Sequence, residues 1–257
     1  EQSDRELKVV LLRPAKFGEI VTFTCEYSGR EPRQGLKFVD ETPENPRLVW
    51  SDSWPDNVHH WFPCFDYPND KATSEIMATV KAGLKVASNG RLVGVAEDKA
   101  SGTTTYHWSQ DLPHSTYLIF LAAAPYVVVR DSYGTLPVNY WVYPGDEAKA
   151  GPTYGKTPAM IAFFNKIFGY DYPWQKYDQI SVPLGGGAES TSAGHDLADH
   201  GLGGGRARLH RHRDRLPRAG PPVVGRPHHP PQLGPRLDER KLRDVLGLPV
   251  SPPRQRR

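Results

Sequence analysis

The sequence predicts a mainly β protein: an antiparallel β-sandwich or saddle over residues 1–145, then the start of an α/β domain, then a disordered tail. From residue 8 to residue 145, apolar or alternating runs of strand length follow one another. Turn signals rather than helical periods separate these runs, which is typical of antiparallel all-β architectures. A helical period begins only after residue 156, and the aromatic residues end before residue 194.

Nine segments of the first domain are expected as strands. They are residues 8–14, 19–27, 74–82, 84–88, 91–97, 103–110, 115–124, 126–131 and 137–144. The turn Ser88-Asn89-Gly90 predicts a hairpin between the fourth and fifth of these segments, because Asn-Gly favours tight two-residue turns.

Residues 50–75 are dense in Trp, Pro and Asp, and we expect an irregular loop there. The loop carries several possible metal ligands: His59, His60, Cys64, Asp66 and Asp70. However, adjacent histidines in an extended chain point to opposite sides, and Cys-x-Asp lacks the usual ligand spacing. The pattern therefore predicts no metal site in this loop.

Residues 146–155 are expected as a linker that ends the first domain. Thr157 is the predicted N-cap of a helix over residues 157–168, with Pro158 in the first turn and Gly169 as the stop. Apolar residues at helical spacing predict a stripe that faces the core: Met160, Phe163, Phe164, Ile167 and Phe168.

A short strand begins at Lys176 and breaks into Gly185, Gly186 and Gly187, followed by Ala188 and Glu189. Glycines after a strand let the backbone lie close to a ligand, because no Cβ stands in the way. A carboxylate placed there can hold a cation such as the free amine of a peptide. The alternative is a glycine-rich turn with a solvated Glu.

Two stretches, residues 157–193 and the run HWFPCFDYPNDKATSE at 60–75, resemble the zinc aminopeptidases of the aminopeptidase N and leukotriene hydrolase family (gluzincin metallopeptidases). The resemblance covers roughly residues 9–193. It implies an N-terminal β domain at 1–145 and the start of a thermolysin-like catalytic domain at 156–193. The parent enzymes remove N-terminal residues from peptides, so the implied partner is the N-terminus of a peptide substrate.

The family has a Gly-x-Met-Glu-Asn motif whose strand pairs with the substrate backbone and whose Glu grips the substrate amine. The resemblance therefore implies that Glu189 anchors the amine, although Ala188 replaces the usual Met and Ser190 the usual Asn. Upstream, residues 51–53 replace the family's Gln-Gly-Glu, so no pocket Gln can be assigned.

The zinc motif of the family is absent from this reading frame. The family uses His-Glu-x-x-His, whose histidines bind zinc while the Glu acts as general base, and a third ligand Glu eighteen residues after the second His. The histidines beyond residue 193 do not form this pattern: His195, His200, His210, His212, His228 and His229. The sequence thus predicts no catalytic residue and no bound zinc in this chain.

Residues 194–257 have no aromatic residue and carry 13 Arg. They could form a basic tail that binds nucleic acid, but aromatic residues for base stacking are missing. They could instead form a solvated low-complexity linker, or be translated out of frame.

A shift by one base supports the out-of-frame interpretation. Residues 217–226 then permit HELGHQWWGD, and residues 237–245 permit WTNESFATY. The two hidden histidines fall over Pro217 and Pro221 and the hidden Glu over Arg240, with eighteen codons between the last two positions. We therefore expect a frameshifted tail on a truncated chain, and no nucleic-acid partner.

Composition sets few further limits. No apolar run approaches the ~20 residues needed to span a bilayer. The N-terminus has neither Met nor a signal pattern, which predicts a fragment or a processed chain. Cys25 and Cys64 predict free thiols rather than a disulfide framework. Compartment, substrate preference and oligomeric state stay open.

Overall fold

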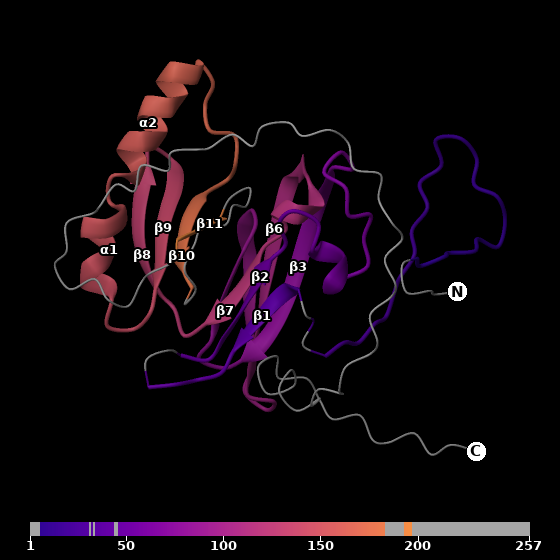
Figure 1. Cartoon of the computed structure of the whole chain (residues 1–257), viewed down its shortest axis with the longest axis horizontal. Coiled ribbons are helices and arrows are strands. Elements are labelled where there is room, and N and C mark those ends of the chain that lie inside the picture. Colours follow the sequence, from indigo (N-terminus) through magenta and orange to yellow (C-terminus); the bar gives the residue numbers. More distant parts are fainter. Residues whose placement is uncertain (1–5, 31, 33, 44–45, 183–192, 197–257) are drawn as a thin grey trace, which may run out of the picture.

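The computed structural model describes residues 6–30, 32, 34–43, 46–182 and 193–196 (Figure 1). It is mainly β, which confirms the predicted class. The strands are β1 (Gly35–Val39), β2 (Leu48–Asp52), β3 (Ala72–Lys81), β4 (Lys85–Ser88), β5 (Arg91–Asp98), β6 (Thr103–His114), β7 (Leu121–Ala124), β8 (Val127–Tyr133), β9 (Leu136–Val142), β10 (Tyr177–Ser181) and β11 (Ala193–Asp196). The helices are α1 (Glu147–Tyr154) and α2 (Thr157–Phe168), with 3₁₀ turns η1 (Val58–His60) and η2 (Thr116–Leu118).

Two antiparallel sheets form the first part of the fold. One has the strand order β1-β2-β7-β4 and the other the order β3-β6-β5. The main core lies against both sheets, with Val49 and Ala123 of the first sheet and Trp108 of the second among its buried residues. The apolar run at residues 115–124, expected as one strand, is divided between η2 and β7.

The third sheet is mixed, with the order β11-β10-β9-β8. β8 and β9 are antiparallel, whereas β10 runs parallel to both β9 and β11. Helices α1 and α2 lie on one side of this sheet in Figure 1, and a second core cluster includes Tyr140, Tyr154 and Ile161. The sheet thus joins β8 and β9, which precede the expected domain boundary, to β10, which follows it. The domain boundary itself stays a prediction. Residues 146–155, expected as a linker, include α1.

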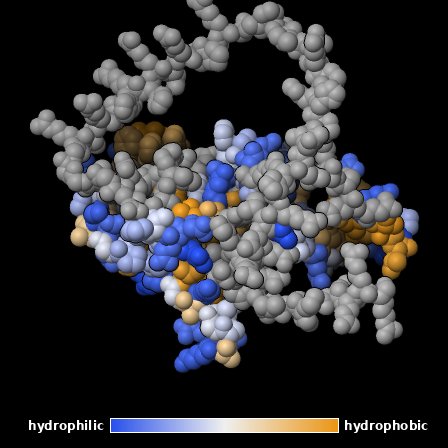
Figure 2. Space-filling view, turned by 60° about the horizontal axis from the view of Figure 1, so that its bottom comes forward, coloured by the Kyte–Doolittle hydropathy of each residue, from blue (hydrophilic) through white to orange (hydrophobic). Residues whose placement is uncertain are grey.

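The prediction of strands at residues 8–14 and 19–27 is wrong. The structure describes both segments and assigns no strand to either. A strand needs a neighbour for its backbone hydrogen bonds, and these segments are largely exposed, with Leu12 at 109% and Ile20 at 91% relative exposure. Figure 1 shows this N-terminal segment extending away from the sheets, and Figure 2 shows orange residues on the same side.

The predicted hairpin at Ser88-Asn89-Gly90 is also wrong. β4 pairs with β7 and β5 pairs with β6, so the turn carries the chain from one sheet to another. Asn89 fixes this crossing: its Nδ2 donates to the Leu118 carbonyl at 2.8 Å, and its Oδ1 accepts from the Phe120 N–H at 2.6 Å. These tertiary hydrogen bonds override the local hairpin preference.

Helix α2 begins and ends where the sequence predicts, and Gly169 closes it with φ +62°. Two details differ. Thr157 is the first helical residue rather than the N-cap, because α1 leads almost directly into α2. The stripe expected to face the core is exposed, as Phe163 at 57% and Phe168 at 72% show. Thr157 and Ile161 are buried instead, each 6% exposed, because the helix packs on β8 through its other side.

β11 lies at the start of the segment expected as a disordered tail, so residues 194–196 are a correction to that expectation. The rest of the tail lies outside the described residues. Neither helix in the described part of the chain is long and apolar enough to cross a membrane.

Candidate functional site

Strand β10 is the element that leads into the glycine-rich segment. It lies between β9 and β11 and runs parallel to both. Ile180 and Val182 are fully buried, as expected for a parallel strand that is covered on both faces. The described residues are interrupted after residue 182, just before the segment that the sequence singled out, and resume at residue 193.

The predicted binding residues themselves, Gly185, Gly186, Gly187, Ala188 and Glu189, lie outside the described residues. Their role in holding a peptide amine therefore stays a prediction. What the structure describes is the strand that leads into them and the side chains that fix it.

A buried ion pair holds the beginning of β10. The Lys176 ammonium donates to Oδ2 of Asp178, and the two side chains are 6% and 0% exposed. Asn139 of β9 donates from Nδ2 to the other carboxylate oxygen of Asp178 at 2.7 Å. The Lys176 ammonium also lies 4.6 Å from the ring centre of Trp108 on β6. Burial lowers the pKa of Lys176, and the Asp178 carboxylate partly opposes that shift. These contacts connect β10 to two neighbouring strands.

A buried tyrosine holds the end of β10. The hydroxyl of Tyr126 donates to the Ser181 carbonyl at 2.9 Å. Its ring stacks on Tyr143, with ring centres 5.7 Å apart, and is 1% exposed. Burial raises the pKa of Tyr126 well above its usual value, so the hydroxyl stays protonated and remains a donor.

Helix α2 also contacts β10. The Thr157 hydroxyl lies 2.7 Å from both Gln179 Oε1 and the Tyr154 carbonyl oxygen. This contact joins the end of α1, the start of α2 and the middle of β10. The strand that leads into the glycine-rich segment is therefore fixed from both faces of its sheet.

The irregular loop expected at residues 50–75 is shorter in the structure, because β2 runs to Asp52 and β3 begins at Ala72. Within it, Asp66 holds the loop together. Its Oδ2 lies 2.8 Å from His59 Nδ1 and accepts from the His59 backbone N–H at 3.1 Å. Its Oδ1 accepts from the Thr116 hydroxyl at 3.4 Å. Burial raises the pKa of Cys64 to about 12, so this thiol is protonated at neutral pH. His59 and Asp66 thus pair with each other, and the possible ligands of this loop do not gather around one metal position.

The described residues do not fit a zinc ion. Nowhere in the described ranges do three or more His, Cys, Asp or Glu side chains gather with metal-ligand geometry. A catalytic zinc needs three protein ligands around one open position. We therefore derive no chemical step through zinc for this chain.

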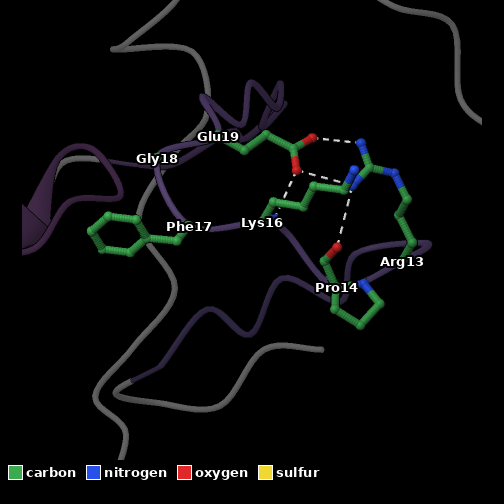
Figure 3. A pocket seen from close by; sticks show the side chains of 6 residues that line it. All are labelled: Arg13, Pro14, Lys16, Phe17, Gly18 and Glu19. Carbon is green, nitrogen blue, oxygen red and sulfur yellow. Dashed lines mark hydrogen bonds and ion pairs between the residues drawn. The ribbon is translucent and has the colours of Figure 1, made fainter.

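A surface hollow of about 780 Å³ lies at one turn of the N-terminal segment, between Arg13 and Glu19 (Figure 3). Arg13 donates from its two terminal nitrogens to the Glu19 carboxylate at 3.0 and 2.5 Å, and the Lys16 backbone N–H donates to the same carboxylate at 2.8 Å. The guanidinium lowers the pKa of Glu19. Arg13 and Glu19 neutralise each other, which leaves Lys16 as the lining residue whose charge is not balanced within the hollow.

The sequence reading missed the residues that fix β10: Lys176, Asp178, Asn139 and Tyr126. One signal was available, since Lys176 and Asp178 are two positions apart in a strand and so share a face. Opposite charges on a strand face that continues with Ile180 and Val182 indicate a buried ion pair. Asn139 and Tyr126 carry no such local signal, because their partners are 39 and 55 residues away.

Comparison with known proteins gives the relationships of the chain. Residues 1–118 match the model of the peptidase M1 N-terminal domain. Glutamyl aminopeptidase of Homo sapiens is 31% identical over 179 residues, which are 67% of this chain and 18% of that protein. Aminopeptidase 2, mitochondrial, of Saccharomyces cerevisiae is 29% identical over 147 residues, 57% of this chain and 15% of the relative.

Leucyl aminopeptidase of Saccharolobus solfataricus is 31% identical over 128 residues, 49% of this chain and 16% of that protein. The chain therefore spans less than a fifth of the length of each of these relatives.

Proposed function

Because this chain is an N-terminal portion of a peptidase M1 family aminopeptidase, we propose that its parent is a zinc-dependent metallo-aminopeptidase that hydrolyses N-terminal residues from peptides. The observation that carries the proposal is the match of residues 1–118 to the peptidase M1 N-terminal domain. The relatives include glutamyl and leucyl aminopeptidases, which supports the same reaction class.

In this proposal, Glu189 holds the free amine of a peptide and Gly185–Gly187 expose backbone for pairing with it. The described structure supports the proposal through β10, because a strand fixed by Asp178 and Tyr126 gives the next residues a defined starting point. β11 pairs with β10 over Asp178–Ser181, so in this proposal the peptide pairs with backbone beyond β10.

Binding of short peptides tests this anchor. We expect the chain to bind a peptide with a free N-terminus, and acetylation of that N-terminus to weaken binding by about tenfold, since a charge-assisted hydrogen bond contributes about 1.5–3 kcal/mol. Glu189→Gln should cause a similar loss, whereas the control Glu97→Gln on exposed β5 should cause none. Equal affinity for free and acetylated peptides would contradict the role of Glu189.

We further propose that the chain as written is inactive, because its zinc ligands and general base are encoded in another frame. Sequencing the DNA from the codon of Gly185 to beyond Arg257 tests this. Correcting one inserted or missing base should restore His-Glu-Leu-Gly-His over residues 217–221 and the distant Glu over Arg240. DNA whose corrected frame lacks that motif would contradict the frameshift, and bases that stand as translated would identify a pseudo-enzyme without the zinc motif.

A second candidate function is a non-catalytic β domain that binds peptides or proteins. It is favoured by one observation: the described sheets enclose a substantial core although the zinc motif is absent. The aromatic-free tail argues against it, because an adapter should keep a folded C-terminal part. Binding that is indifferent to N-terminal acetylation would favour this second function over the first.

A further inference from the structure

We propose that Asn89-Gly90 is a site of spontaneous deamidation that is unreactive in the folded chain, becomes reactive on unfolding and then prevents refolding. Of the six asparagines in the sequence, Asn89 alone precedes a glycine. Deamidation of asparagine is fastest before glycine, because no Cβ on the following residue shields the attacking nitrogen. The proposal does not depend on the aminopeptidase function.

The reaction needs no reagent other than water. The backbone nitrogen of Gly90 attacks Cγ of Asn89, and the bond between Cγ and Nδ2 breaks. Nδ2 leaves as ammonia with the proton of the Gly90 amide, and a cyclic succinimide remains. Water then opens the ring at one of its two carbonyls. One opening gives Asp at position 89, and the other gives isoaspartate, in which the main chain runs through the former side-chain carbonyl.

The folded chain restrains the Asn89 side chain at both of its polar atoms. Nδ2 donates to the Leu118 carbonyl at 2.8 Å, and Oδ1 accepts from the Phe120 N–H at 2.6 Å. The residue is only 2% exposed. Formation of the succinimide turns Cγ out of this position and expels Nδ2, so both hydrogen bonds must break inside the protein, which is unfavourable.

The attacking nitrogen is restrained as well. Gly90 has φ +72° and lies so close to β6 that an added Cβ would be 1.9 Å from the Ser109 carbonyl oxygen. The strands on either side of the turn are also fixed, since β4 pairs with β7 and β5 pairs with β6. The turn therefore cannot rearrange unless the junction between the two sheets opens first.

Neither product fits the folded junction. Asp at position 89 would place a carboxylate oxygen where Nδ2 donates to the Leu118 carbonyl, so two acceptors would face each other in a buried site. Isoaspartate adds one atom to the main chain between β4 and β5, where the contact of Gly90 with Ser109 leaves no room for it. A chain that deamidates while unfolded therefore loses the ability to join its two sheets, and its unfolding becomes irreversible.

Peptide mapping by mass spectrometry tests the protection of Asn89, with a variant that places the same dipeptide in an exposed turn. Ser101→Asn puts an asparagine before Gly102, which has φ +66° and no described atom within 4 Å of an added Cβ. In the folded variant at mildly alkaline pH, position 101 should deamidate at least about a hundredfold faster than Asn89, since two buried hydrogen bonds protect only Asn89. In urea the two rates should be similar. Similar rates in the folded variant, or a slow Asn89 in urea, would overturn the proposal.

Refolding tests the effect of the products. The wild-type chain is held in urea with a thiol reductant for increasing times, at mildly alkaline or mildly acidic pH, and is then diluted into native buffer. Because the attack requires loss of the Gly90 amide proton, we expect the refolded fraction in gel filtration to fall only after the alkaline incubation. Deamidated Asn89 should be at least about tenfold depleted from the refolded fraction. Equal amounts in the refolded and unrefolded fractions, or an equal loss of refolding after the acidic incubation, would overturn the proposal.

Discussion

Gly90 shows how one residue decides the connection between two sheets. Its backbone has φ +72°, and a Cβ there would lie 1.9 Å from the carbonyl oxygen of Ser109. Any side chain would therefore meet both an unfavourable left-handed backbone and a direct collision with β6. Only glycine allows the crossing from β4 to β5 at this point.

Gly90→Ala should accordingly lower the free energy of unfolding by about 2–4 kcal/mol, since backbone strain and displacement of β6 add to each other. The matched control is Gly102→Ala, where φ is +66° but no described atom lies within 4 Å of the added Cβ. Its loss should be about 1–2 kcal/mol. Urea unfolding followed by tryptophan fluorescence measures both, and equal losses would show that contact with Ser109 is unimportant.

The thiol of Cys64 should react slowly with alkylating reagents. Its pKa of about 12 leaves roughly a thousandfold less thiolate at pH 8 than an ordinary cysteine has. In a Cys25→Ser background, iodoacetamide should alkylate Cys64 very slowly, with a rate that rises about tenfold per pH unit while the fold persists. Unfolding in urea should bring the rate to that of a free thiol. Fast alkylation of the folded chain at pH 8 would contradict the burial of this residue.

At the scale of elements, β10 depends on the pair formed by Lys176 and Asp178. Asp178→Asn should lower the free energy of unfolding by about 3–5 kcal/mol, because it leaves a buried ammonium without its counter-charge. The double variant Lys176→Met/Asp178→Asn should lose less, since no unpaired charge remains. Chemical denaturation of the three proteins tests this, and a double variant at least as unstable as the single one would refute it.

The stability of the Asp178→Asn variant should depend on pH differently from that of the wild-type chain. Without Asp178, the pKa of Lys176 falls further below its value in the unfolded chain, because the carboxylate no longer opposes the effect of burial. The unfolded chain then binds more protons than the folded chain over a wider range below pH ~10.5. The stability of Asp178→Asn should therefore rise with pH towards 10 more steeply than that of the wild type. Parallel profiles would show that Lys176 is not desolvated.

Local sequence predicts a strand or helix correctly when the hydrophobic pattern of the segment agrees with the neighbours that it packs or pairs with in the fold. β3 to β6 are apolar or alternating runs of strand length separated by turn signals, and each finds a neighbouring strand, so the sequence indicated them. β1 and β2 were missed because each is only five residues long and lies beside an irregular loop. Residues 8–14 and 19–27 have the composition of strands but no neighbour to pair with in the described chain.

For helix α2 and for the candidate site, too, local pattern predicted some features while long-range contacts decided the others. The 3.6-residue period fixed the bounds of α2 and the stripe of Phe163 and Phe168, but the period cannot say which packing partner is present. The sequence marked residues 185–189 as the candidate site, and they lie outside the described residues. The contacts that fix β10, from Asn139 and Tyr126, are long-range and invisible to any local pattern.

At the scale of the molecule, the chain combines the N-terminal part of an M1 aminopeptidase with a tail of different composition. The described part has a buried core built from three sheets. The tail has 13 Arg and neither aromatic residues nor the zinc motif. The described part accounts for a folded core, whereas the proposed lack of hydrolysis rests on the absence of His-Glu-x-x-His from the sequence.

The most direct test is to purify the full chain with added zinc and to measure aminoacyl-anilide hydrolysis and bound metal together. We predict a hydrolysis rate equal to the blank and no stoichiometric zinc, because no His-Glu-x-x-His is translated. A rate above the blank that a chelator abolishes and zinc restores would contradict the account, since it would show that these residues assemble a catalytic zinc site.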